Sequence, residues 1–221
     1  MHMPQDASLL WKALYSFFTI LKPFFCRLRV EGRAHIPATG GCIIACNHTI
    51  GPDYLLLGYA SSRQIYYMAK AELFRVHPWF SRFLETAGTF PVNRGRHDLE
   101  AFATAQTLLR QGRVLGMFPE GTRSHTGELQ RGKTGAIRLA MQVQTPVVPA
   151  VVINAQSILK QMGRRPVVIV RFGPPLYPTG DPNHKPTVQA ATDETMHAIA
   201  QLLPPTQRGS YGQTPITVLE K

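Results

Sequence analysis

The chain has 221 residues, of which 44% are hydrophobic and 17% charged, which is enough for one sizeable hydrophobic core. Its formal charge of +11 predicts an anionic partner, such as a phosphorylated substrate or a membrane surface, and no zinc-finger or RNP pattern favours nucleic acid. Three cysteines, a small and odd number, argue against a disulfide scaffold and fit a reducing compartment.

The first predicted element is an amphipathic helix within residues 8–30. Its uninterrupted apolar-to-neutral run, residues 13–21, is short, because a membrane-spanning helix needs about 20 residues. Basic and aromatic side chains surround this run, which is typical of a helix lying in a membrane interface. A helix packed on the domain is the alternative. We expect residues 1–30 to form a membrane-associating segment in which Pro23 breaks or turns the helix.

From residue 31 to about residue 204 the chain alternates predicted strands and helices. The strands are predicted at 42–46, 64–69, 89–93, 113–118, 146–153 and 166–172, and the helices at 52–62, 78–88, 98–112, 133–143 and 187–203. This alternation predicts an α/β domain at 31–204, with a mainly parallel or mixed central sheet covered by helices on both faces. Residues 205–221 are expected to form a flexible tail.

A histidine and an aspartate follow the first predicted strand, in the stretch NHTIGPD at residues 47–53. On an ideal helix five residues turn through ~500°, so His48 and Asp53 would not share a face. The glycine and proline between them let the backbone change course, and Asp53 in the first turn of the next helix then reaches one ring nitrogen of His48. The other nitrogen becomes a general base for an alcohol. A loop histidine beside a helix-capping aspartate is the alternative.

A second polar stretch, FPEGTRS at residues 118–124, follows the strand predicted at 113–118. It places a carboxylate, a flexible glycine and an arginine next to one another. A guanidinium binds phosphate through paired hydrogen bonds, so this loop is a candidate anion site. The stretch GTFPVNRGR, Gly88–Arg96, adds two arginines after a short strand. Each of these stretches alone also fits a solvated surface turn.

Taken in order, these stretches resemble the glycerolipid acyltransferase family that includes 1-acylglycerol-3-phosphate acyltransferases. The resemblance spans about residues 30–175 and lies in four blocks, His48–Asp53, Phe90–Arg94, Phe118–Ser124 and Val148–Pro149. A His-x4-Asp pair followed by FPEGTRS is highly specific as a combination. Ile50 departs from the usual family pattern, and this departure concerns the acceptor rather than the catalytic pair.

The resemblance implies transfer of an acyl group from a thioester of coenzyme A or acyl carrier protein to a glycerolipid hydroxyl. His48 is implied as the general base and Asp53 as its orienting partner, with direct attack and with no acyl-enzyme, metal or cofactor. The acceptor implied first is 1-acylglycerol 3-phosphate, giving phosphatidic acid, while glycerol 3-phosphate or another lysolipid, including a phosphate-free one, stays open. The implied substrate-binding residues are Lys70, Arg94, Glu120, Gly121, Thr122 and Arg123.

The resemblance and the amphipathic segment together predict a peripheral or monotopic protein on the cytoplasmic face of a membrane. Two other hypotheses stay open. Cys46 and His48 would lie ~6.6 Å apart on a strand, which would suit a cysteine acyl-enzyme, although an apolar run is typical of an inert core thiol. A non-catalytic basic module that binds membranes or nucleic acid would explain the charge but not the acid–base residues. Cys42 and Cys46 would be ~13 Å apart along a strand, too far to share a metal ion.

Overall fold

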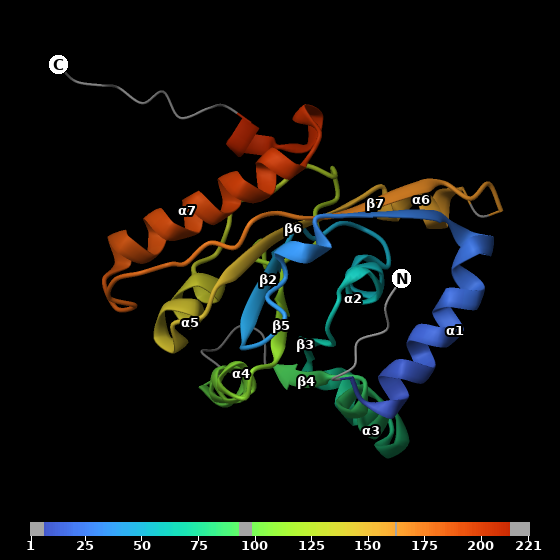
Figure 1. The fold of residues 1–221 in the computed structure, drawn as a ribbon, viewed down its shortest axis with the longest axis horizontal. Coiled ribbons are helices and arrows are strands. Elements are labelled where there is room, and N and C mark those ends of the chain that lie inside the picture. The colour runs from blue at the N-terminus through green and yellow to red at the C-terminus, as the bar shows by residue number, and fades with distance from the viewer. Residues whose placement is uncertain (1–6, 93–98, 162, 213–221) are drawn as a thin grey trace.

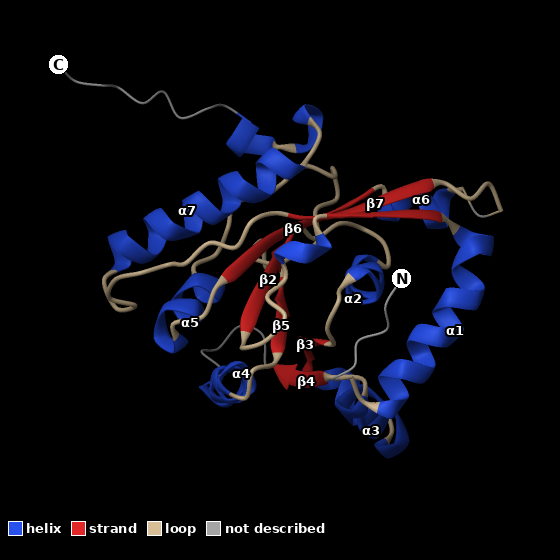
Figure 2. Ribbon diagram, viewed as in Figure 1, coloured by secondary structure: helices blue, strands red, loops and turns tan. Residues whose placement is uncertain are grey.

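The computed structural model describes residues 7–92, 99–161 and 163–212, and the strands of these residues form one seven-stranded mixed sheet (Figures 1 and 2). The order across the sheet is β1-β7-β6-β2-β5-β3-β4, and among these pairs β6–β7 is antiparallel and the others are parallel. The strands are β1 (Arg27–Glu31), β2 (Cys42–Cys46), β3 (Ile65–Lys70), β4 (Thr89–Val92), β5 (Val114–Met117), β6 (Val147–Ile153) and β7 (Val167–Phe172).

Helices cover both faces of the sheet, as the sequence predicts (Figure 1). The α-helices are α1 (Leu9–Phe25), α2 (Asp53–Ala60), α3 (Pro78–Thr86), α4 (Leu99–Arg110), α5 (Gly135–Val143), α6 (Ala155–Lys160) and α7 (Lys185–Leu202). Strand β2 shows how the two faces are separated, because successive side chains point in opposite directions. Ile43 and Ala45 pack with α4, α5 and α7, whereas Cys42, Ile44 and Cys46 pack with α2 and α6. The predicted α/β fold is therefore confirmed.

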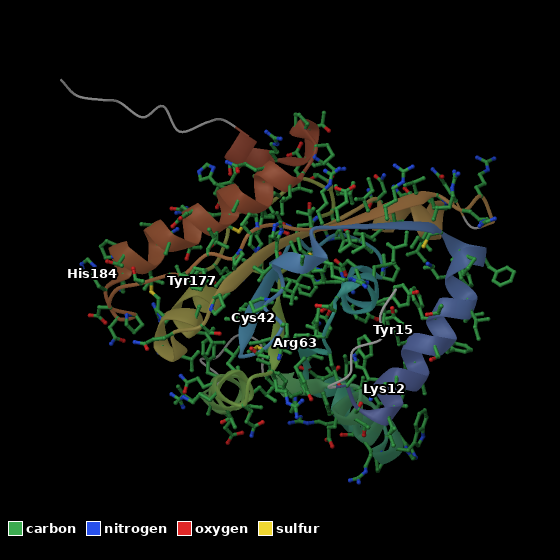
Figure 3. All side chains as sticks on the ribbon, viewed as in Figure 1. Lys12, Tyr15, Cys42, Arg63, Tyr177 and His184 are labelled. Atoms are coloured by element: carbon green, nitrogen blue, oxygen red, sulfur yellow. The ribbon has the colours of Figure 1, made fainter. Side chains whose placement is uncertain are left out.

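The first helix, α1, packs on α2 and forms an outer layer. Trp11 and Tyr15 are buried, and the Tyr15 ring stacks on Tyr59 of α2 with 4.6 Å between centroids (Figure 3). The opposite side of α1 is apolar and exposed, with exposed fractions of 85% at Leu9, 61% at Phe17, 69% at Ile20 and 68% at Phe24. Within the described ranges, no helix is both long enough and apolar enough to cross a bilayer.

Two local features near the start of the chain differ from the expectations drawn from the sequence. Helix α1 continues through Pro23 and ends at Phe25. Residues 27–31 then form the edge strand β1, so the expected boundary at residue 30 falls inside the sheet. The alternation in RLRVE explains this strand, because Leu28 and Val30 pack on the core while the charged residues face solvent.

The beginning of the expected tail is folded on the domain. Residues 205–212 contain two short 3-10 helices, η3 (Pro205–Gln207) and η4 (Gly209–Gly212). The Leu129 N–H donates to the Gln207 carbonyl at 2.9 Å, and the Gly132 N–H donates to the Tyr211 hydroxyl at 3.2 Å. Long-range hydrogen bonds of this kind are not visible in local sequence. Residues 213–221 lie outside the described part of the chain.

The parallel strands bring the predicted motifs to one edge of the sheet. Strands β2 and β5 are neighbours that run in the same direction, so the loops that follow them start at the same edge. The two loops pair directly, through a parallel bridge between Thr49 and Ser124 and a hydrogen bond of 2.8 Å from the Ser124 N–H to the His48 carbonyl. At the opposite edge, the buried Arg63 guanidinium donates to carbonyls of the surrounding loops and holds them together.

Candidate active site

The loop after β2 is fixed before it reaches the predicted histidine. The side chain of Asn47 continues the pairing with β6, because its Nδ2 donates to the Val152 carbonyl at 3.3 Å and its Oδ1 accepts from the Val152 N–H at 2.8 Å. Gly51 then has φ 150°, and a Cβ there would lie 2.8 Å from the carbonyl carbon of Ala155. Only glycine fits this bend against α6, which is the change of course expected from the Gly-Pro pair.

His48 and Asp53 meet across the bend. The distance from His48 Nδ1 to Asp53 Oδ2 is 2.7 Å. The same oxygen accepts the Thr49 N–H at 2.9 Å, and Oδ1 accepts the Tyr54 N–H at 2.8 Å, so the fully buried carboxylate is held by three donors. An ionised carboxylate only accepts, so Nδ1 carries the proton and Nε2 is left as an acceptor. A bound hydroxyl can give its proton to such a nitrogen.

Aromatic rings fix the plane of the imidazole. Phe118 stacks on the His48 ring with 4.1 Å between centroids and 22° between planes. The Tyr67 ring of β3 is nearly parallel to the Phe118 ring, with 6.4 Å between centroids, and its hydroxyl donates to the Tyr54 carbonyl at 2.9 Å. The sequence singled out Phe118 only as part of a motif and did not single out Tyr67. Their roles follow from the adjacency of β3 and β5 in the sheet.

Glu120 connects the two loops through their backbones. Its Oε1 accepts the His48 N–H at 2.5 Å, and its Oε2 accepts the Gln130 N–H at 2.9 Å. The residue is 3% exposed, and burial raises the pKa of its carboxyl group, while the two N–H groups act in the opposite direction. Because each oxygen already has a backbone partner, this carboxylate sets the position of His48. Its expected contact with substrate stays a prediction.

The remaining predicted binding residues differ in how they are placed. Gly121 has φ +73°, a left-handed conformation that suits glycine, and it presents Thr122 and Arg123 as exposed side chains directly beside Glu120. Lys70 is exposed at the end of β3, one strand beyond β5 at the same edge. Arg94 lies outside the described residues.

The loop after β2 leads to an apolar rim on the site. Ile50 is 39% exposed, and Tyr54 and Leu55 in the first turn of α2 are 41% and 50% exposed. The loop after β5 instead exposes the cation of Arg123. The segment after β2 therefore offers apolar surface near His48, and the loop after β5 offers positive charge. Such a combination suits an amphiphilic molecule with an anionic group.

Cys46 does not have the surroundings of a nucleophile. It is fully buried, and burial raises the pKa of its thiol well above the ordinary value, so the reactive thiolate is disfavoured. Its Sγ lies 3.5 Å from Asn47 Oδ1, within the core between β2 and the helices. In the part of the chain that the structure describes, no three His, Cys, Asp or Glu side chains gather as metal ligands do.

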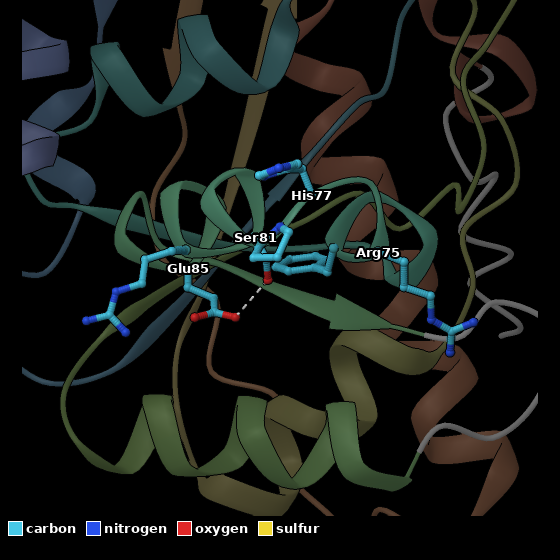
Figure 4. A pocket seen from close by; sticks show the side chains of 7 residues that line it. Arg75, His77, Ser81 and Glu85 are labelled. Atoms are coloured by element: carbon cyan, nitrogen blue, oxygen red, sulfur yellow. Dashed lines mark hydrogen bonds between the residues drawn. The ribbon is translucent and has the colours of Figure 1, made fainter.

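A hollow of about 530 Å³ lies along η2 (Ala71–Arg75) and α3, and it is lined by none of the predicted site residues (Figure 4). Two of its polar groups are already engaged with each other, because the Ser81 hydroxyl donates to Glu85 at 3.1 Å. Arg75 points away from this pair (Figure 4). The predicted site residues therefore lie around His48 and not in this hollow.

A buried aspartate that holds a histidine ring at the carboxyl edge of an α/β sheet suits general-base chemistry. Comparison with known proteins makes the class specific, because the Acyltransferase family model matches residues 27–153. A 1-acyl-sn-glycerol-3-phosphate acyltransferase of Bacillus subtilis is 34% identical over 151 residues, 68% of this chain and 74% of the relative. The chain belongs to the acyltransferase family.

Two further relatives show how much of the chain is matched and support its fold. The 1-acyl-sn-glycerol-3-phosphate acyltransferase alpha of Mus musculus is 32% identical over 148 residues, and the match covers 63% of this chain and 50% of that protein. The crystal structure of the 1-acyl-sn-glycerophosphate acyltransferase of Thermotoga maritima superposes with a TM-score of 0.63 at 20% identity, covering 87% of this chain and 79% of that one. At this identity the likeness supports the fold alone.

Proposed function

We propose that this chain moves a fatty acyl group from acyl-CoA or acyl carrier protein to the free hydroxyl of a lysophospholipid, with 1-acylglycerol 3-phosphate as the acceptor and phosphatidic acid as the product. The observation that carries the proposal is the His48 ring, whose Nδ1 is held by buried Asp53 at 2.7 Å and whose Nε2 is left to accept a proton. The names of the curated relatives support this choice of acceptor.

In the proposed reaction, His48 Nε2 takes the proton of the acceptor hydroxyl while the oxygen attacks the thioester carbonyl. The tetrahedral intermediate collapses with cleavage of the carbon–sulfur bond, and the imidazolium returns its proton to the leaving thiolate. Asp53 stabilises the imidazolium and keeps Nδ1 protonated. Glu120 holds the His48 backbone in place, and the proposal needs no acyl-enzyme.

The surfaces around His48 match the two ends of such an acceptor. The exposed apolar rim at Ile50, Tyr54 and Leu55 supports contact with acyl chains. Exposed Arg123 is proposed to bind the acceptor phosphate, helped by Arg94. Thr122 and Gly121 would border the glycerol, and Lys70 would stabilise either the thioester oxyanion or the anionic headgroup.

We also propose that the enzyme works at a membrane surface, on the cytoplasmic side. The exposed apolar face of α1 would lie in the bilayer interface, while Trp11 and Tyr15 on its other face hold the helix to the domain. The positive net charge adds attraction to anionic lipids. Three free cysteines fit a reducing compartment.

The decisive experiment is transfer of radiolabelled acyl groups to 1-acylglycerol 3-phosphate, with acyl-CoA and acyl carrier protein thioesters as donors in turn. We expect transfer by the wild type, and a loss of about 10²–10⁴-fold in rate for His48→Ala. His184→Ala is the matched control, because His184 is an exposed residue at the N-terminal end of α7 (Figure 3). This variant should be as active as the wild type. If the wild type binds liposomes but transfers from neither donor, the chain is a non-catalytic module and the proposal fails.

The acceptor is tested separately. Under the same conditions, glycerol 3-phosphate and a phosphate-free lysolipid should be poorer acceptors than 1-acylglycerol 3-phosphate. A higher kcat/KM for either of them would keep the acyltransfer but overturn the choice of acceptor.

A further inference from the structure

A lysine that lies outside the recognised motifs reaches into the site. The backbone N–H of Lys133 donates to the Pro119 carbonyl at 2.8 Å, which fastens the segment before α5 to the loop after β5. Its side chain runs across Gly121, and a Cβ built on that glycine would meet Lys133 Nζ at 2.7 Å and Cε at 2.9 Å. The ammonium group therefore lies directly over the backbone that joins Glu120 to Thr122.

This ammonium has no counter-charge within the described residues. Lys133 is exposed, and its side chain makes no hydrogen bond or ion pair there. Glu120, next to Gly121, is buried and has both oxygens engaged by backbone N–H groups. Glu128, the acid nearest to Lys133 in sequence, is exposed and forms no ion pair with it. Lys133 also stands two residues before the first residue of α5, where the helix dipole does not favour a cation. The position therefore gains little from a positive charge unless an anion binds there.

Gly121 explains why the lysine can take this position. The residue has φ +73° and no side chain, so the last atoms of Lys133 pack against its Cα. Any larger residue would have to displace the ammonium group. Arg123, two positions further along the same loop, is exposed as well. The loop thus presents two cations next to the residue that holds the His48 backbone.

We propose that Lys133 is a specificity-determining residue, whose ammonium group binds the phosphate of the acceptor and selects phosphorylated lysolipids over phosphate-free ones. This inference rests on the proposed acyl transfer, because it assigns the anion to the acceptor of that reaction. A lysine ammonium binds phosphate as a compact charge with three donors, which complements the planar fork of an arginine. The motifs in the sequence do not single out Lys133, because it lies outside FPEGTRS, which ends at Ser124.

The first test measures binding without catalysis. Isothermal titration calorimetry would compare 1-hexanoylglycerol 3-phosphate with 1-hexanoylglycerol, using wild type, Lys133→Met, Lys133→Arg and Lys185→Met. Lys185 is the matched control, since it is an exposed lysine that begins α7 and follows His184 at the far end of that helix (Figure 3). We expect Lys133→Met to bind the phosphorylated ligand about tenfold more weakly, Lys133→Arg to keep most of the affinity, and the control to equal wild type.

The second test uses steady-state kinetics with both acceptors. Lys133→Met should raise the KM for the phosphorylated acceptor about tenfold and leave kcat, the donor KM and turnover of the phosphate-free acceptor near their wild-type values. A rise in the KM for acyl-CoA alone would assign the ammonium group to a donor phosphate and overturn the inference. Equal losses with both acceptors, which a displaced loop would cause, would also overturn it.

The two assays separate the inference from the proposed function. If the wild type binds the phosphorylated ligand, Lys133→Met weakens that binding and no acyl transfer occurs, then the anion site stands and the proposed reaction falls. If transfer occurs and Lys133→Met changes neither binding nor KM, the reaction stands and the role of Lys133 falls. Absence of any wild-type binding to the phosphorylated ligand would likewise refute the anion site.

Discussion

Replacement of Asp53 by asparagine tests the catalytic pair with the smallest change of shape. In the wild type the carboxylate accepts three N–H groups, from His48 Nδ1, from Thr49 and from Tyr54. An amide has one acceptor oxygen and a donor NH2 group, so at least one of these three N–H groups must face another donor. A lost hydrogen bond to a charged acceptor is worth about 1.5–3 kcal/mol.

The effect on rate follows from the direction of the amide. If the oxygen of the new side chain faces Tyr54, its NH2 group faces His48 Nδ1, which must then become the acceptor. The proton moves to Nε2, and the base is lost. If the oxygen faces Nδ1, the ring keeps its tautomer but loses the negative charge that stabilises the imidazolium. We therefore expect kcat to fall about 10²–10⁴-fold, with a small change in acceptor KM.

The assay is acyl transfer under saturating donor, with circular dichroism and thermal unfolding to show that Asp53→Asn is folded. Glu194→Gln, an exposed acid on α7, controls for the loss of one negative charge and should be as active as wild type. His48→Ala combined with Asp53→Asn should lose no more activity than His48→Ala alone, because the two residues act as a unit. A folded Asp53→Asn with more than about a tenth of the wild-type kcat would refute the general-base reasoning.

Three further predictions concern other parts of the structure. Glu120→Gln leaves one acceptor oxygen for the two backbone N–H groups of His48 and Gln130. It should lower the free energy of unfolding by about 1–3 kcal/mol in urea titrations and lower kcat in the acyl-transfer assay. An unchanged kcat would exclude a role of Glu120 in positioning His48. Burial raises the pKa of the Cys42 thiol from 9.0 to about 11, so the folded state favours the neutral thiol. The resulting stability is present below pH 9, and up to about 3 kcal/mol of it is lost as the pH rises to about 11. Urea titrations at pH 8 and pH 11 should show a smaller loss for Cys42→Ala than for wild type, and equal losses would count against this account. Phe17→Ser with Phe24→Ser on the exposed face of α1 should weaken binding to anionic liposomes in flotation assays without lowering thermal stability, whereas undiminished binding would argue against α1 as the contact surface.

Much of this protein is determined by short-range features of the sequence. The alternation of apolar strands with amphipathic helices predicts the α/β class, because each period reflects which face of an element must be covered. The pairing of His48 with Asp53 is also local, since a glycine and a proline between them are enough to turn the backbone. The start of α2 is also predicted locally, because proline and aspartate are favoured in the first turn of a helix, and α2 begins at Asp53. The order of the motifs is sufficient for the family resemblance.

Tertiary structure decides the contacts that no window of sequence contains. Glu120 reaches the His48 backbone across 72 positions because β2 and β5 lie side by side in parallel. The same adjacency stacks Phe118 on the imidazole. The fold of the segment after β5, fastened by the bond from the Lys133 N–H to the Pro119 carbonyl, brings Lys133 over Gly121. Strand β1 lies within the segment predicted as amphipathic, and its pairing with β7 is what makes residues 27–31 a strand. Local patterns fix the elements and their ends, whereas the order and direction of strands in the sheet fix which loops meet, and that order depends on packing of the whole chain.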